Sequence, residues 1–113
     1  MLMKLDALFE IMLGAAVLVA AASGALGDGD FPWPVGTVVL LLVGAVLVLL
    51  GVVIWSGRLD KRGLAVGNAM SAVLGIVWLT TVSGFSDAGT VLVAVTIAGL
   101  AGLAAAQVAT LWT

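Results

Sequence analysis

Glu10 is the residue whose chemistry most needs an explanation. It lies within an apolar run that extends from Ala7 to about Leu26. A carboxylate in such a run costs free energy unless a charge, a proton or a set of hydrogen bonds compensates it. An acid inside a membrane-spanning segment commonly marks a proton or ion pathway. Its type and position therefore make Glu10 a candidate proton or cation site.

Two amide side chains are candidate partners of Glu10. Asn68 lies six residues after Arg62, and Gln107 lies six residues before Thr113. Glu10 lies six residues beyond Lys4, which is about 9 Å along a helix. We therefore expect the acid and the two amides to reach a similar depth and to form one hydrogen-bonded layer.

Two hypotheses explain this layer. In the structural one, Asn68, Gln107 or a base from a loop holds Glu10, and the bonds set the register of the helices. In the functional one, the Glu10 carboxyl exchanges a proton against a substrate or an ion. Asp6 lies one turn earlier on the same face, and like charges at this spacing repel each other.

The other reactive side chains are few. The chain has no cysteine and no histidine, which excludes disulfides, thiolate nucleophiles, Cys/His zinc sites and the usual axial ligands of haem. Asp6, Glu10 and Asp60 are too few to support a reaction. We expect no catalytic residue, no metal site and no cofactor, and hence no enzyme.

One stretch, residues 27–34, is rich in turn-forming residues. Its two prolines, Pro32 and Pro34, block a helix until Val35, where a helix can start with Pro34 just ahead of it. In the favoured interpretation this loop caps the membrane interface, with Trp33 at the lipid headgroups. In the alternative, Asp28 and Asp30 bind an external cation such as Ca²⁺, for which two carboxylates are few ligands.

The composition is that of a membrane protein. Of the 113 residues, 64% are hydrophobic and only 9% are charged, and the mean hydropathy is +1.36. A soluble fold of this size could not bury so much apolar surface. The net charge of −2, without a basic stripe, gives no support to nucleic-acid binding. The lipid bilayer is therefore the expected surrounding, and the Ala, Val, Leu and Gly richness suggests a prokaryote.

The lengths of the apolar runs predict the fold. A bilayer core takes about 20 residues of helix, and the chain has room for four such segments. We expect a single transmembrane domain over residues 1–113, an all-α integral membrane four-helix bundle. The expected helices span residues 6–26, 35–56, 63–83 and 89–111.

The basic residues predict the orientation. All four lie on one side of the expected helices, whereas the other two connections carry only acids. By the positive-inside rule, both termini are expected in the cytoplasm, with the protein in the inner (plasma) membrane. The bases are Lys4, Arg58, Lys61 and Arg62, and the acids are Asp28, Asp30 and Asp87. Aromatic residues fit this orientation, with Phe31, Trp33 and Phe85 at the outer interface and Phe9, Trp55 and Trp112 at the inner one.

Small residues recur at helical spacing on every expected helix. Close packing through such residues is what holds helices together in lipid. We expect bundle packing within one chain or between copies, and the alternative is a narrow pore. The candidate packing residues are Gly63, Gly67, Ser71 and Gly75 on the third helix and Ala98 and Gly102 on the fourth, with Ala16, Ala20 and Gly24 on the first and Gly44 and Gly51 on the second.

A faint internal repeat predicts two parallel helical hairpins. Four short segments of the first half recur in the same order in the second half. They are Ala16-Val17-Leu18, Ser23-Gly24, Gly36-Thr37-Val38 and Trp55, matched by Ala72-Val73-Leu74, Ser83-Gly84, Gly89-Thr90-Val91 and Trp112. The stretch from Asn68 to Leu79, followed by Ser83-Gly84-Phe85, resembles the small prokaryotic SPW-repeat membrane proteins.

Other fragments resemble the small multidrug resistance transporters. They are Phe9-Glu10-Ile11, Pro34-Val35-Gly36-Thr37 with Gly44, and Gly57-Arg58-Leu59-Asp60. The resemblance implies four helices, an antiparallel dimer and exchange of protons for cations at Glu10. This chain has Val38, Val39, Leu40 and Leu41 where that family has aromatic residues.

The sequence thus favours a non-enzymatic four-helix membrane protein that acts by helix packing, as a homo-oligomer or as an accessory subunit of a membrane complex. The small-residue stripes and the scarcity of reactive side chains support this expectation. The alternative is a small proton-coupled transporter or channel that uses Glu10.

Overall fold

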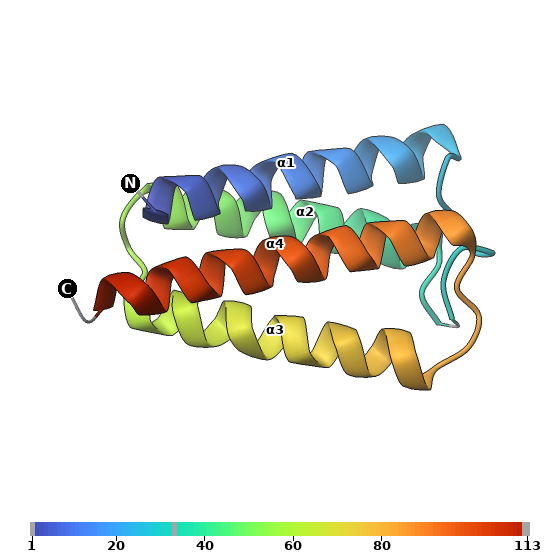
Figure 1. The fold of residues 1–113 in the computed structure, drawn as a ribbon. Helices are drawn as coiled ribbons and strands as arrows, with labels where there is room; N and C mark the ends of the chain where they lie inside the picture. The colour runs from blue at the N-terminus through green and yellow to red at the C-terminus, as the bar shows by residue number, and fades with distance from the viewer. Residues whose placement is uncertain (1, 33, 112–113) are drawn as a thin grey trace.

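Four α-helices run up and down in a bundle (Figure 1). The computed structural model describes residues 2–32 and 34–111, with the side chains of residues 3–32 and 34–110. Trp33 and Trp112, expected at the membrane interfaces, lie outside these ranges. The helices are α1 (Leu2–Ser23), α2 (Thr37–Trp55), α3 (Lys61–Thr81) and α4 (Asp87–Leu111).

All four helices are long and apolar enough to cross a membrane. With 19 to 25 residues each, they measure about 28 to 37 Å. The outward face of α2 is apolar, as a surface in contact with lipid must be. Its exposed side chains include Val38, Leu42, Val46 and Leu49. The all-α fold of four transmembrane helices is therefore confirmed, and the chain is a multi-pass membrane protein.

The helix ends differ from the expected ones by up to four residues. α1 begins at Leu2 instead of residue 6, because Lys4 and Asp6 are accommodated in its first turns. It ends at Ser23, since Gly24 adopts a φ of 82°, a conformation that favours glycine and breaks the helix. The other ends lie within two residues of the predicted ones.

α1 and α2 form a tightly packed hairpin. A Cβ atom on Gly14 would lie 2.7 Å from the carbonyl oxygen of Gly44, and one on Gly44 would lie 2.9 Å from that of Gly14. The two backbones are therefore in direct contact, as small residues allow. Gly51 approaches Ala7 in the same way. Of the expected stripe on α1, Ala16 and Gly24 are exposed, so α1 uses a different face.

α3 and α4 form the second hairpin, in which few of the predicted packing residues take part. Gly75 lies against Ile97, whereas a Cβ on Gly63, Gly67 or Gly102 would meet nothing within 4 Å. Ser71 and Ala98 are exposed. α3 instead buries Leu64, Ala65, Asn68 and Ala72. Packing of the other predicted residues between copies of the chain stays a prediction.

The two hairpins meet at their ends. At one end lie both termini and the loop of residues 56–60, and we call it the terminal end; the distal end carries the connections 24–36 and 82–86. α1 and α3 diverge toward the distal end (Figure 1). Between the two ends, the ring of Phe9 on α1 contacts Gly99 of α4.

Pairing of α1 with α2 and of α3 with α4 is what a two-hairpin repeat requires, although the repeat itself stays a prediction.

Loop 24–36 fills the gap at the distal end. Phe31 is buried there, stacked on Trp78 with ring centroids 6.3 Å apart and edge-on to Phe85 at 6.2 Å. Trp78 and Phe85 are 4.6 Å apart. Three aromatic rings from the loop, α3 and the last connection thus close this end of the bundle.

Asp28 and Asp30 hold the distal connections in place. The amide of Thr37 donates to Asp28 at 2.8 Å, which caps α2. Asp30 accepts hydrogen bonds from the Ser86 hydroxyl and from the Gly27 amide, and these bonds, led by that of Ser86, lower its pKa. Both carboxylates therefore satisfy groups of the chain itself, which argues against the external cation site.

Candidate functional site

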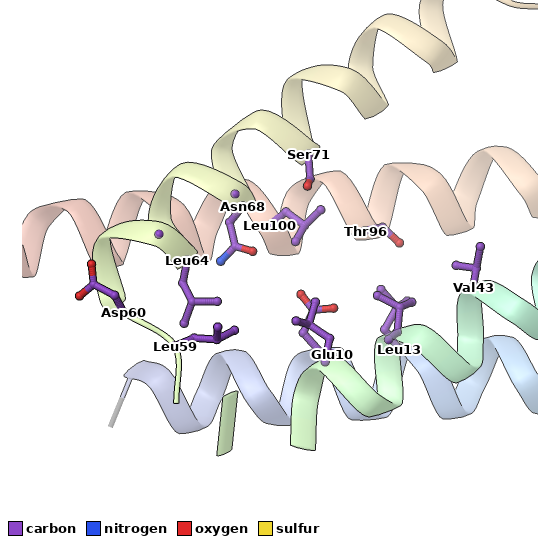
Figure 2. A pocket seen from close by; sticks show the side chains of 14 residues that line it. Glu10, Leu13, Val43, Leu59, Asp60, Leu64, Asn68, Ser71, Thr96 and Leu100 are labelled. Carbon is purple, nitrogen blue, oxygen red and sulfur yellow. The ribbon is translucent and has the colours of Figure 1, made fainter. Parts of the chain in front are cut away.

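A cavity of about 570 Å³ lies between the two hairpins, next to the terminal end. All four helices and the loop of residues 56–60 contribute to its lining, with α2 and α3 on opposite walls (Figure 2). Most of the lining consists of leucine, valine and glycine. The polar side chains that line it are Glu10, Asp60, Asn68, Ser71 and Thr96.

A second cavity of about 250 Å³ continues the first one toward the distal end. The two share Leu13, Leu47 and Leu100 among other residues. The second cavity reaches Phe31 and Trp78, and its lining is almost entirely apolar. Together they form a cleft that is polar near the terminal end and apolar beyond it.

Glu10 points into the larger cavity (Figure 2). The side chain is only 4% exposed. It lies on the face of α1 that also buries Asp6, Ala7 and Gly14, at helical spacing. Within the side chains that the structure describes, its carboxyl makes no hydrogen bond and no ion pair. Glu10 is thus a buried acid without a partner among the described side chains.

Asn68 and Gln107 lie together, but the acid between them is Asp6. Asn68 Nδ2 donates to Asp6 Oδ2 at 2.7 Å, and Gln107 Nε2 donates to the same oxygen at 2.6 Å. Asn68 Nδ2 also donates to Gln107 Oε1 at 3.1 Å. This cluster, the Asp6–Asn68–Gln107 triad, joins α1, α3 and α4. The expected layer therefore contains Asp6 in place of Glu10.

The difference has a geometric reason. The expected depth of Glu10 was counted from Lys4, but α1 begins at Leu2. Asp6 therefore lies four residues from the start of α1. Gln107 likewise lies four residues from the end of α4 at Leu111. One turn deeper, α3 has moved away from α1 (Figure 2), which leaves Glu10 beside the cavity. The shared face of Asp6 and Glu10 was the sequence signal for Asp6.

Asp6 is the most completely enclosed acid among the described side chains. Its side chain is 0% exposed, and Oδ1 is a buried oxygen without a hydrogen-bond partner in the described part of the chain. Two amide donors satisfy the other oxygen. Asp6 therefore joins the hairpins, whereas Glu10 faces the open space.

In the part of the chain that the structure describes, no base lines the cavity. Lys4 Nζ lies 4.9 Å from the ring centroid of Trp55, and Lys61 Nζ donates to Thr110 Oγ1 at 3.2 Å. Arg58 and Arg62 are exposed. The charged side chains of the lining are Glu10 and Asp60, and Asp60 is exposed next to the terminal end, just before α3 (Figure 2). The electrostatic character of the cavity is acidic.

Comparison with protein-family models, with curated proteins and with solved structures finds no match to this chain. The two family resemblances therefore stay predictions, and the function has to be argued from the cavity and the residues around it.

Proposed function

We propose that this membrane protein is a small, non-enzymatic proton-coupled transporter that binds a cationic ligand at Glu10. The observation that carries the proposal is the position of Glu10, which is buried, faces the cavity and has no partner among the described side chains. An acid in this environment needs either a proton or a counter-charge. A proton and a cation therefore compete for the same carboxyl, which is the basis of exchange.

The surroundings of Glu10 support a cation over an anion. Glu10 and Asp60 are the charged groups of the lining. Of the nearby bases, Lys4 lies over the Trp55 ring, Lys61 donates a hydrogen bond to Thr110, and the two arginines are exposed. Asp60, which is exposed at the terminal end, attracts positive charge from the water there. The apolar second cavity accepts the uncharged part of a ligand.

Liposome flux tests the proposal. The full chain, reconstituted with an outward proton gradient, should drive uptake of an organic ammonium ion, and Glu10→Gln should reduce uptake to that of empty liposomes. Asp87→Asn serves as the matched control, because Asp87 is exposed at the start of α4. Uptake that survives Glu10→Gln, or that is absent from the parent protein, would refute the proposal.

A second candidate function is helix packing in a homo-oligomer or as an accessory subunit. It is favoured by Ala98 and Gly102, which are exposed on α4, and a side chain at position 102 would meet open space. Such faces accept a neighbouring helix in lipid. Mass measurement in lipid nanodiscs would support this candidate through a defined oligomer and would count against it through a monomer without a co-purifying protein.

We also propose that both termini face the cytoplasm of a prokaryotic plasma membrane. The four bases belong to the terminal end, and Asp28, Asp30 and Asp87 belong to the distal end. The chain has no cysteine, so single cysteines at Arg62 and Asp87 are clean reporters. A membrane-impermeant maleimide added to intact cells should label Asp87→Cys and not Arg62→Cys, and the opposite pattern would reverse the orientation.

A further inference from the structure

We infer that Asn68 makes the cavity selective for cations that carry N–H groups, such as a protonated primary amine, over quaternary ammonium ions. The inference rests on the proposed function, because it names the ligand class that the Glu10 site prefers. It comes from the orientation of one amide group, which the neighbouring triad determines.

The triad determines which end of the Asn68 amide faces the cavity. Asp6 Oδ2 and Gln107 Oε1 are acceptors, and Asn68 Nδ2 donates to both. A planar amide that turns its nitrogen toward two acceptors turns its oxygen away from them. Asn68 lines the cavity, whereas Asp6 and Gln107 do not. Figure 2 shows the Asn68 oxygen on the side of Leu100, above Glu10.

The Asn68 oxygen is an acceptor without a donor. Among the described side chains, Oδ1 receives no hydrogen bond. Thr96, across the cavity, donates its hydroxyl proton to the Leu92 carbonyl at 2.8 Å, so its oxygen also presents lone pairs. The carboxylates of Glu10 and Asp60 add further acceptors, and among the lining side chains the Ser71 hydroxyl is the group that can either donate or accept. A ligand that donates hydrogen bonds completes this arrangement.

Primary and quaternary ammonium ions differ in this respect. Both carry the charge that Glu10 attracts, but only the primary ion donates N–H bonds. A trimethylated head would leave the Asn68 oxygen buried against methyl groups, which costs free energy. A site built to hydrogen-bond its ligand discriminates against analogues that lack the donor. The apolar second cavity, toward Trp78, accommodates the body of the same ligand.

The test compares 2-phenylethylammonium with its N,N,N-trimethyl analogue by calorimetry on the full chain in nanodiscs. We expect the primary ion to bind about tenfold more tightly. Asn68→Leu should clearly reduce this preference, which then depends on the Glu10 and Thr96 acceptors alone. Asp6→Asn should have the same effect. An amide at position 6 can donate a hydrogen bond to the Asn68 oxygen, so the Asn68 amide can flip and present its nitrogen to the cavity. Thr80→Val is the control on α3, since the Thr80 hydroxyl bonds only to carbonyls of its own helix, and it should leave the ratio unchanged.

The outcomes separate this inference from the proposed function. Equal affinities in the parent protein, with both lost in Glu10→Gln, would overturn the role of Asn68 and keep the cation site. A preference for the primary ion that persists undiminished in both Asn68→Leu and Asp6→Asn would also overturn it. Binding of neither ion, or binding that does not depend on Glu10, would overturn both.

Discussion

Asn68 Nδ2 donates a hydrogen bond of 2.7 Å to Asp6 Oδ2, across 62 positions of the sequence. Asp6 belongs to the first hairpin and Asn68 to the second, so this bond closes the bundle at its terminal end. Gln107 adds a second donor to the same oxygen. The triad thereby joins the two hairpins near the terminal end, and Glu10 lies one turn deeper on α1, in the lining of the cavity.

Loss of a triad donor should weaken the bundle. Gln107→Leu keeps the approximate volume of the side chain but leaves Asp6 with one amide donor instead of two. We expect the free energy of unfolding to fall by about 1 to 2 kcal/mol. Steric-trapping measurements in bicelles would record it. Thr81→Val, whose hydroxyl bonds only to its own helix, should change stability little; an equal loss in both variants would contradict the bridging role.

Much of the fold follows from simple lengths and spacings. Four apolar runs of bilayer length required four helices, and Asn68 and Gln107 drew attention because polar groups are rare in such runs. The tight contact of Gly44 with α1 could also be predicted, because Gly44 and Gly51 share one helix face and leave room for a neighbouring backbone.

The remaining features of the site depend on how the helices are placed relative to one another, which the sequence of one helix does not determine. The start of α1 and the divergence of α3 from it determine which acid contacts the two amides. The prediction was wrong by one helical turn, because Asp6 makes these contacts and Glu10 does not. The glycines of α3 show the same limit. Gly67 and Gly75 lie on one stripe, yet Gly75 meets Ile97 and Gly67 faces the cavity, because the rotation of α3 is set by its neighbours.

Two glycines should respond differently to the same substitution. A methyl group at Gly44 would lie 2.7 Å from Leu18 Cγ and 2.9 Å from the Gly14 carbonyl oxygen, which forces α1 and α2 apart. We expect Gly44→Ala to destabilise the protein by about 1 to 3 kcal/mol. Gly102→Ala meets open space and should be neutral or stabilising by up to about 1 kcal/mol. Thermal unfolding in one detergent compares the two, and similar losses would contradict the close contact of α1 and α2.

The distal end should respond to acid through Asp30. Its pKa is lowered by the hydrogen bonds from Ser86 and Gly27. A lowered pKa means that the ionised carboxyl stabilises the folded chain above its ordinary pKa, and that this contribution is lost as the pH falls through the lowered value. Ser86→Ala removes the larger cause, so the Asp30 pKa should rise toward its ordinary value. Carboxyl ¹³C titration by NMR measures it, and an unchanged midpoint would disprove the effect of Ser86.

The second candidate function predicts a specific loss of assembly. If copies of the chain pack through the exposed face of α4, then Gly102→Leu should disperse the oligomer in nanodiscs while the fold persists, because the larger side chain stands between neighbouring helices. Val46→Leu is the control, because Val46 is a large exposed side chain on the outward face of α2, away from α4. An oligomer that survives Gly102→Leu does not use this face.

The proposed function requires that a cation and a proton compete for the Glu10 carboxyl, so ligand binding should be accompanied by proton release. Addition of 2-phenylethylammonium to the purified protein in weakly buffered solution, with a pH indicator, should release protons in proportion to the ligand bound. Glu10→Gln should release none. Ligand binding without proton release, or equal release from Glu10→Gln, would show that the two do not compete for this carboxyl.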